Sequence, residues 1–297
     1  MKIIQHRRKF FVLSSVLILS SIFSLIVWGL KPGIDFRGGF LTEVKFTKQV
    51  PEKSDFIQKM KELSIDDLTV QLSGENKMLI RFISDDDDIN TKIQTKIKEE
   101  YPNSIVERTS FVSSAISKEL KTKAIQALIV AVIGIMLYIM WAFRKVSYPV
   151  ESWKYGLAAI IALAHDIIIT LGAFVLLGNK YGMEVNIPFI AALLTILGYS
   201  VNDTIVIFDR IRENLNRAQA KKEFEETVNR SINESLMRSL NTSFTVVIVL
   251  LAIIFFGGES VKNFSIALLI GIIVGTYSSI FVASAILVES WRYKMKR

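Results

Sequence analysis

The sequence "ILGYSVNDTIVIFDRIREN" (residues 196–214) combines the pattern of a membrane-spanning helix with acidic side chains. Asn202 and Asp203 lie next to each other inside a mostly apolar run, and Asp209 and Arg210 follow where that run ends. A charge at the centre of a bilayer costs about 2.5–3.5 kcal/mol on insertion scales. We therefore expect Asp203 to have a bonded partner, a water-filled path or a bound proton.

Similar apolar blocks recur along the chain, in which 51% of the residues are hydrophobic. A spanning helix needs about 20 mostly apolar residues. This pattern predicts a polytopic α-helical membrane protein with six transmembrane helices, at residues 10–30, 123–143, 155–177, 186–208, 240–256 and 264–288. The first segment follows a basic N-terminus, as a signal peptide would. Its apolar run is long and lacks a clear small-residue cleavage site, so we expect an uncleaved anchor.

Basic residues gather at alternate ends of these segments and predict that both termini are cytoplasmic. The alternate loops, residues 178–185 and 257–263, hold one lysine each. The net charge of +8 is therefore mainly a topology signal, and we expect no nucleic-acid partner. The basic residues of the predicted cytoplasmic side are Lys2, Arg7, Arg8, Lys9, Arg144, Lys145, Lys154, Arg210, Arg212, Arg217, Lys221, Lys222, Arg230, Arg238, Arg292, Lys294, Lys296 and Arg297.

One large extracytoplasmic segment, residues 31–122, has a different periodicity. Residues 40–47 alternate as a half-buried strand does, and residues 51–63 carry apolar side chains on one helical face. Two strands around the turn Gly74-Glu75-Asn76, a second helix and a last strand follow. The order βαββαβ predicts an α+β, ferredoxin-like domain. The expected organisation is residues 1–30 (N-terminus and first helix), 31–122 (this domain) and 123–297 (five helices with a cytoplasmic loop at 209–239).

The acidic run Asp85–Asp88 is interpreted as the first turn of the second helix, with Ser84 as its N-cap. A calcium loop would need spaced ligands and a glycine, which this run lacks. We therefore expect no calcium site here.

Polar residues within the spans are the candidate functional residues. Asp203 shares a helical stripe with Thr195, Tyr199 and Asn202, and lies about 7–9 Å deeper than Asp209 by helix rise. Burial disfavours its charged form, which favours a proton-binding role over a fixed hydrogen bond.

His165 and Asp166 lie near the middle of the third segment. Histidine titrates near neutral pH, so the pair could handle protons, or His165 could be a neutral partner of a neighbouring helix. Adjacent helical residues point about 100° apart, so we expect that the two cannot serve one site equally. With two histidines and no cysteine in the chain, we predict no metal site, no cofactor and no catalytic residue.

The sixth segment carries a stripe of small residues at four-residue spacing: Ala267, Gly271, Gly275, Ser279 and Ala283. Such stripes allow close helix approach, and we expect packing within the chain, with packing onto a partner chain as the alternative.

Four motifs carry a family resemblance: "GIDFRGG" (residues 33–39), "ALAHDIIIT" (162–170), "LGYSVNDTIVIFDRIREN" (197–214) and "RSLNTS" (238–243). Together with six spans and one large domain after the first, they resemble the SecF branch of the SecD/SecF family of bacterial protein-export membrane subunits. The resemblance covers essentially the whole chain. The third motif is very specific, whereas "FRGG" alone would be weak.

The resemblance implies a subunit of the bacterial inner membrane that pairs with SecD, often with YajC, and associates with the SecYEG channel. This family is similar to the resistance-nodulation-division transporters, which build their membrane core from two related halves, so SecD is expected to complete the core. By the same resemblance, the pair is expected to use the proton-motive force to help draw unfolded preproteins outward after the step driven by SecA.

The residue roles follow the same resemblance. Asp203 is implied to be the proton-relay carboxylate and Arg238 its charged partner, although Arg238 stands at the cytoplasmic start of the fifth segment. Asn202, Thr242 and Ser243 are expected to complete the polar lining. His165 and Asp166 match a family motif without an assigned role.

Three other functions are compatible with the sequence. A proton-coupled half-transporter of the resistance-nodulation-division type would carry a small or lipid-like substrate. A membrane enzyme would need a nucleophile motif or metal triad, and none accompanies the acidic residues. A passive scaffold would hold Asp203 in a fixed hydrogen bond.

Overall fold

The computed structural model describes residues 1–63, 65, 68–74, 76–144, 150–217 and 224–295. They form two compact units, which are described separately. The helical unit contains Met1–Leu30, Gln126–Met183 and Pro188–Arg297, and the sheet unit contains Lys31–Ile125 and Glu184–Ile187. Five of the predicted cytoplasmic basic residues and one turn residue lie outside the described residues: Glu75, Lys145, Lys221, Lys222, Lys296 and Arg297.

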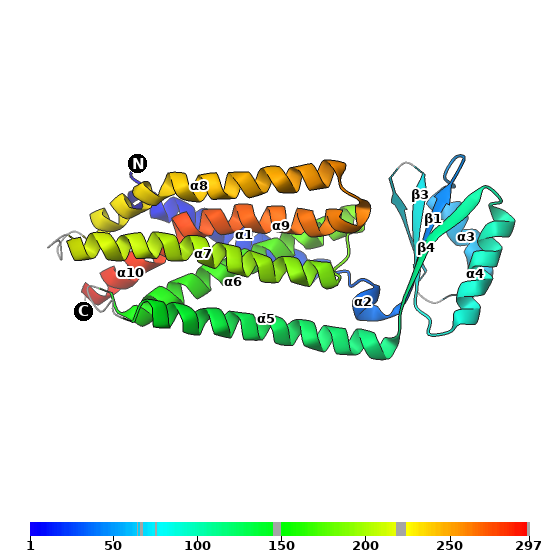
Figure 1. The fold of residues 1–297 in the computed structure, drawn as a ribbon, viewed down its shortest axis with the longest axis horizontal. Coiled ribbons are helices and arrows are strands. Elements are labelled where there is room, and N and C mark those ends of the chain that lie inside the picture. Colours follow the sequence, from blue (N-terminus) through cyan, green and yellow to red (C-terminus); the bar gives the residue numbers. More distant parts are fainter. Residues whose placement is uncertain (64, 66–67, 75, 145–149, 218–223, 296–297) are drawn as a thin grey trace. The chain divides into compact units, whose positions relative to one another are not determined.

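Each of the six predicted membrane segments overlaps a helix long and apolar enough to cross a membrane, and the first predicted segment extends past its helix, which ends at Val27. A short 3₁₀ turn, Ile4–His6, precedes the first helix, and a π turn, Ser279–Ala283, interrupts the last span. Figure 1 shows the N- and C-terminal ends at the same end of the helical unit. The helices are α1 (Arg7–Val27), α5 (Ser114–Ala142), α6 (Ser152–Tyr181), α7 (Ile187–Arg217), α8 (Phe224–Phe256), α9 (Glu259–Ser278) and α10 (Ser284–Met295).

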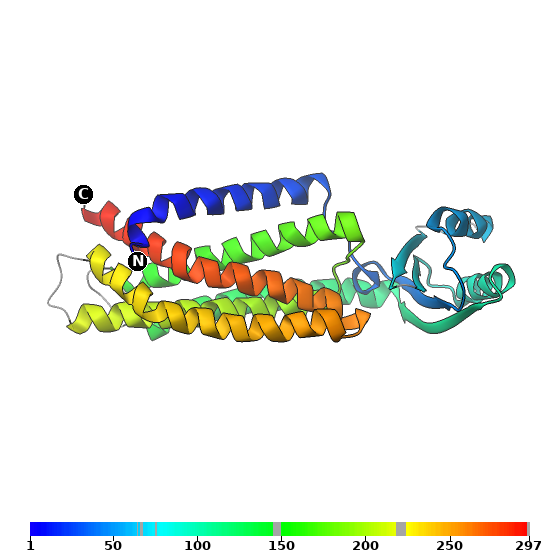
Figure 2. The ribbon, with the colours of Figure 1, turned by 90° about the horizontal axis from the view of Figure 1, so that it is seen from above.

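Small residues bring α9 close to α7 in this unit. A Cβ atom built on Gly271 would lie 2.1 Å from the Cδ1 atom of Ile196, and one on Gly275 would lie 3.0 Å from the Cβ atom of Ser200. Ala267, Ser279 and Ala283 are also fully buried. The small-residue stripe therefore packs within the chain, as expected. Figure 2 shows α1, α6, α9 and α8 side by side in that order, in agreement with the contacts between them.

Other faces of the helical unit remain apolar and uncovered. On α5, Val130 is 69% exposed and Trp141 62% exposed, and on α8 Phe244 is 64% exposed. In a membrane protein such faces contact lipid or another subunit.

The sheet unit is a small antiparallel sheet with two helices. The strand order is β2-β3-β1-β4, and all three pairings are antiparallel. Apolar side chains of α3 and α4, including Phe56 and Ile93, pack with those of β1 and β3, including Phe40 and Ile80, in one core. Its elements are α2 (Ile34–Arg37), β1 (Gly39–Phe46), α3 (Lys53–Met60) followed by a 3₁₀ turn (Lys61–Leu63), β2 (Thr69–Ser73), β3 (Lys77–Phe82), α4 (Asp87–Glu100) and β4 (Ser104–Val112).

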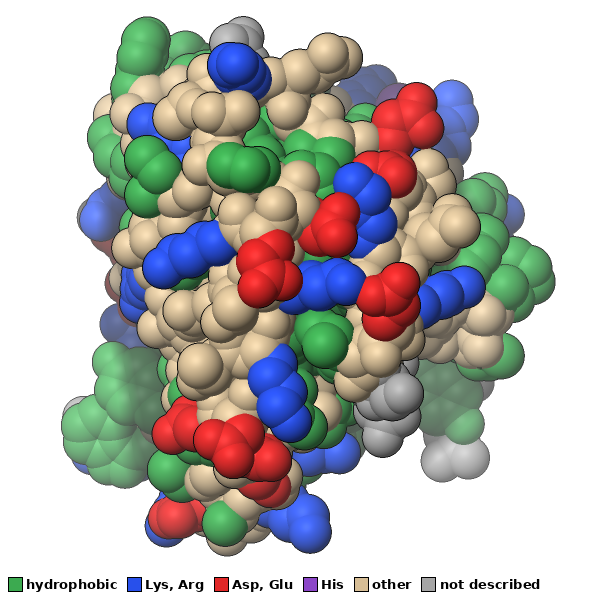
Figure 3. Space-filling model, turned by 90° about the vertical axis from the view of Figure 1, so that its right-hand side faces the viewer, with side chains coloured by type: hydrophobic (Ala, Val, Ile, Leu, Met, Phe, Trp, Pro, Cys, Tyr) green, Lys and Arg blue, Asp and Glu red, His purple; other side chains and the backbone are tan. Residues whose placement is uncertain are grey.

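The charged surface over α3 and α4 alternates in sign. Lys59 pairs with Asp55 and Glu100, and Lys96 pairs with Glu62 and Glu100. Figure 3 shows basic and acidic side chains interspersed on this side. The described side chains on this side form no large field of one sign.

The predicted N-cap of α4 was wrong. Asp86, rather than Ser84, is the N-cap residue, and its side chain accepts a hydrogen bond from the backbone N–H of Asp88 at 2.9 Å. The hydroxyl of Ser84 accepts from the backbone N–H of Asp86, two residues on. Asp85 accepts from the backbone N–H and the hydroxyl of Ser114, so it belongs to the start of α5 rather than to the first turn of α4.

The glycine pair that opens β1 has a conformational reason. Gly38 and Gly39 have φ angles of 82° and 101°, which other residues rarely adopt. A Cβ atom on Gly39 would lie 2.2 Å from the carbonyl oxygen of Phe82 and 2.9 Å from the Cα atom of Ile83. Both neighbours are backbone atoms of β3 and its end, so they cannot turn away. Only glycine fits at this position.

We predict that Gly39→Ala destabilises the sheet unit by more than about 2 kcal/mol, because it adds a backbone clash to the strain of a positive φ. Gly74→Ala is the matched control, since Gly74 has a φ of 67° and nothing within 4 Å of the added atom. Thermal unfolding and limited proteolysis of the full chain measure both. Equal losses in the two variants would contradict the steric explanation.

Candidate functional site

Asp203 lies in α7 with its carboxyl group turned into the helical unit. The residue is 7% exposed. Its Oδ1 atom accepts a hydrogen bond of 2.5 Å from the hydroxyl of Ser239 on α8. Its Oδ2 atom is buried and has no hydrogen-bond partner among the residues that the structure describes. One oxygen of this carboxyl group is therefore available to hold a proton.

Serines at four-residue spacing place the polar face of α8 against α7. Ser235, Ser239 and Ser243 are all buried, because residues four apart lie on one helical face. The hydroxyl of Tyr199 on α7 donates to Ser243 at 3.1 Å, and Ser243 lies 2.6 Å from the hydroxyl of Thr276 on α9. A layer of hydroxyl groups thus joins three helices one turn from Asp203.

The other predicted relay and lining residues take different positions. Arg238 is exposed and makes no ion pair with Asp203 in the described part of the chain, although it is near enough to act on it electrostatically. Asn202 and Thr242 are exposed, and Thr242 donates to the carbonyls of Arg238 and Ser239 in its own helix. Ser243 alone joins the buried layer. The polar stripe of α7 therefore continues from the buried Asp203 onto an uncovered face.

His165 and Asp166, which we expected to be unable to serve one site equally, do contact each other. The His165 Nδ1 atom lies 2.9 Å from the Asp166 Oδ1 atom. The Cβ directions of adjacent residues diverge, but the imidazole is long enough to turn beside the shorter carboxylate. Both residues are buried, at 3% and 0% exposure.

Asp166 also joins α6 to two other helices. Its Oδ2 atom accepts hydrogen bonds from Ser200 of α7 at 2.6 Å and from Ser278 of α9 at 2.8 Å. With His165 on the other oxygen, each oxygen of the carboxylate has a partner. Such a fully bonded buried acid stabilises one arrangement of the three helices.

The π turn begins immediately after Ser278. Ser279 donates to the backbone carbonyl of Ser200 at 3.1 Å and lies 2.8 Å from the hydroxyl of Thr204. The extra backbone residue of a π turn re-aims neighbouring side chains, and such turns are frequent at functional sites. Of two consecutive serines, Ser278 at the end of α9 thus reaches α6, and Ser279 at the start of the turn reaches α7.

The sequence motifs included some of these partners without a role for them. Ser239 lies inside "RSLNTS" and Ser200 inside "LGYSVNDT". The recurrence of serine every four residues on α8 is the signal that could have identified Ser239. Nothing in the sequence indicated the π turn or Ser278, because these partners meet only when the helices pack.

The comparisons with known proteins agree with this architecture. A model of the family "Protein export membrane protein SecD/SecF, C-terminal" matches residues 92–292, which include both buried acids. The chain belongs to the SecD/SecF family. The resemblance found in the sequence motifs is thereby confirmed, and protein transport at the membrane is the activity for which this family is named.

Relatives of this SecD/SecF family member include separate and fused proteins. The protein translocase subunit SecF of Thermobaculum terrenum is 40% identical over 98% of this chain and 94% of its own length. SecDF of Bacillus subtilis is 39% identical over 94% of this chain but only 37% of its own length. The crystal structure of the translocon-associated protein SecDF from Thermus thermophilus matches 98% of this chain and 38% of its own, with 34% identity and a TM-score of 0.86.

For this SecD/SecF family chain we predict that Asp166→Ala lowers stability by about 3 kcal/mol, because removal of one partner of a buried pair leaves its donors without an acceptor. Asp209→Ala is the control, since Asp209 is half exposed and pairs with Arg212 one turn away. Thermal unfolding of the full chain in detergent gives the comparison. Equal stability of the two variants would contradict the joining role of Asp166.

Proposed function

We propose that this chain is a SecF-type, non-enzymatic subunit that acts with SecD to promote late steps of protein export at the expense of the proton-motive force. The observation that carries the proposal is the buried Asp203 carboxyl group, with one oxygen bonded to Ser239 and the other unpartnered in the described part of the chain. Asp166, which is also buried in the bundle, has bonds to both oxygens. Asp203 is thus the better suited of the two to gain and lose a proton.

The energetics support this use of Asp203. One proton crossing about 150 mV releases roughly 3.5 kcal/mol. That amount can bias an equilibrium between two conformations if the proton is bound differently in each. The hydroxyl of Ser239 can donate to the carboxylate or accept from the protonated acid, so it can serve both states.

The proposed partner in the membrane is SecD, with Arg238 and Asp203 near their interface. The exposed polar residues Thr195, Asn202 and Arg238 support a partner on this face, since bare lipid is a poor contact for them. Relatives named SecDF, in which the two names are joined in one chain, also support it. We include SecYEG and YajC as further partners, and SecA as an indirect one.

We further propose the bacterial inner membrane as the location, with both termini cytoplasmic and residues 31–122 outside. The shared end of the two termini supports this orientation, together with the distribution of basic residues. The strand order β2-β3-β1-β4 and the element order support a ferredoxin-like assignment for the sheet unit, which we expect to contact unfolded preprotein.

Asp203→Asn tests the proposal. Asparagine keeps the shape and can accept the Ser239 hydrogen bond, but it cannot carry the exchanged proton. We expect proton-driven preprotein release in vesicles that contain the SecD partner to fall at least about tenfold. Asp209→Asn, at the exposed end of the same helix, should keep the wild-type rate.

Release at the wild-type rate in Asp203→Asn would show that the acid is only a structural hydrogen-bond acceptor. Loss of proton uptake without any effect on preprotein release would favour a half-transporter for a small or lipid-like molecule.

A further inference from the structure

The connection between α6 and α7 belongs to the sheet unit. Residues Glu184–Ile187 group with Lys31–Ile125 rather than with the helices on either side of them. α7 begins at Ile187, so the helix that carries Asp203 starts inside this unit. α6 ends only a few residues earlier, at Tyr181.

Backbone hydrogen bonds fix this connection to the segment that precedes β1. The N–H of Val185 donates to the carbonyl of Lys31 at 2.8 Å, and the N–H of Gly33 donates to the carbonyl of Val185 at 2.7 Å. Pro32 and Val185 are therefore paired in a parallel bridge. The approach is close, since a Cβ atom at position 33 would lie 3.2 Å from the Glu184 carboxyl group and 3.3 Å from the carbonyl oxygen of Val185.

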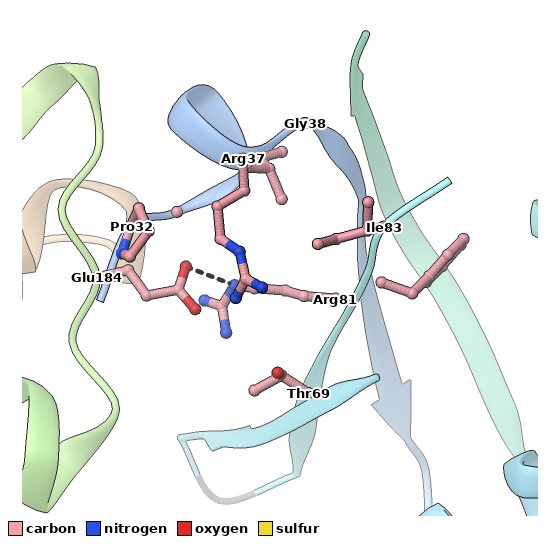
Figure 4. A pocket seen from close by; sticks show the side chains of 10 residues that line it. Pro32, Arg37, Gly38, Thr69, Arg81, Ile83 and Glu184 are labelled. Atoms are coloured by element: carbon pink, nitrogen blue, oxygen red, sulfur yellow. Dashed lines mark ion pairs between the residues drawn. The ribbon is translucent and has the colours of Figure 1, made fainter. Parts of the chain in front are cut away.

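Two side chains of the sheet unit hold the same connection. The Asp35 carboxylate accepts from the backbone N–H of Ile187 at 2.8 Å, at the N-terminus of α7, where an acid is favoured by the helix dipole. Arg81, on β3, pairs with Glu184 at 2.9 Å. Figure 4 shows these two side chains facing each other, with Arg37 and Thr69 nearby, around a cavity of about 30 Å³.

The Arg81–Glu184 ion pair is expected to add little net stability, because removing both charges from water offsets much of their attraction. The side chains are only 15% and 16% exposed, so both charges are largely removed from water. Burial raises the pKa of the Glu184 carboxyl group against the opposing charge of Arg81, and burial lowers the pKa of the Arg81 guanidinium. Both shifts favour the uncharged forms. The contribution of Glu184 to stability therefore falls as the pH rises through its raised pKa.

A buried pair of this kind is better explained by the geometry that it enforces. Charged groups that cost stability fix one arrangement because a displaced partner would leave a buried charge unpaired. The pair, the Asp35 contact and the bridge together leave the connection little freedom. From Ile187 to Asp203, one continuous helix spans about 24 Å.

We propose that Arg81, Glu184 and Asp35 form a rigid joint through which displacement of α7 at Asp203 is transmitted to the sheet unit. These three are positioning residues, and the inference rests on the proposed function of Asp203. The proton binds at Asp203 on α7, and Ile187, the first residue of the same helix, is hydrogen-bonded to Asp35 of the sheet unit. The joint converts the small change at the acid into movement of the sheet unit.

Neutral variants of the pair test the joint in the full chain with its SecD partner. Arg81→Gln and Glu184→Gln should each lower proton-driven preprotein release by about tenfold, since small misplacements far from the chemistry can have effects of this size. Proton uptake by the same vesicles should stay within about twofold of wild type, because Asp203 is unchanged. The double variant should release preprotein no more slowly than the slower of the two single variants, because the two residues act as one unit.

Lys77→Gln is the matched control. Lys77 lies on β3 on the same face as Arg81, and its ion pairs with Glu43 and Glu107 are more exposed. It should release preprotein at the wild-type rate. Wild-type release in either pair variant, additive losses in the double variant, or parallel loss of proton uptake would overturn the joint.

A failure of the proposed function itself would be visible elsewhere. It would show as wild-type release in Asp203→Asn, whereas failure of the joint shows only in the Arg81 and Glu184 variants.

An engineered disulfide tests the rigidity of the joint. The chain has no cysteine, so oxidation acts only on an introduced pair. Pro32→Cys with Val185→Cys places the pair at bridged backbone positions, within the span that a disulfide can cover. Oxidised and reduced protein should release preprotein at the same rate. A block on oxidation that reduction reverses would show that the joint opens during the cycle, and would overturn the proposal.

Discussion

The structure depends on how buried carboxyl groups are hydrogen-bonded where water is scarce. Asp166 meets this constraint fully, because His165, Ser200 and Ser278 surround it and join α6, α7 and α9. Asp203 meets it at only one of its two carboxyl oxygens, which accepts a hydrogen bond from Ser239. The first arrangement stabilises the packing of the helices, and the second leaves a place for a proton. Two acids in the same bundle can thus have different roles because of their neighbours alone.

Helix α7 takes part in both arrangements, and its first residue groups with the sheet unit. α7 carries Ser200 and Asp203 in its middle, and its first residue is bonded to Asp35. The small residues of α9, above all Gly271 and Gly275, let α7 lie close to its neighbour along one face. α7 therefore has a tightly packed side, a polar exposed side and a fixed start. These properties support the proposal that α7 transmits a change over its length.

Much of the site could be predicted from single residues and their spacing. Asp203 was singled out because a carboxyl group in an apolar run is costly, and six spans followed from apolar length. Bonding partners could not be predicted in this way. His165 and Asp166 meet although helix geometry points their Cβ atoms apart, and Asp86 rather than Ser84 caps α4. In both cases the length and direction of a side chain determined which contact formed, and spacing along the sequence does not reveal this.

The sequence by itself determined the number of spans, the separate sheet domain, the family and the acid of interest. Periodicity, apolar length and motif spacing are local properties, and local properties can be read along the chain. Only the tertiary structure decided that Asp166 is fully bonded while Asp203 is not, and that residues 184–187 belong to the sheet unit. These facts depend on contacts between residues far apart in the chain, such as Ser278 with Asp166 and Arg81 with Glu184. Such contacts form only when the helices and strands pack together.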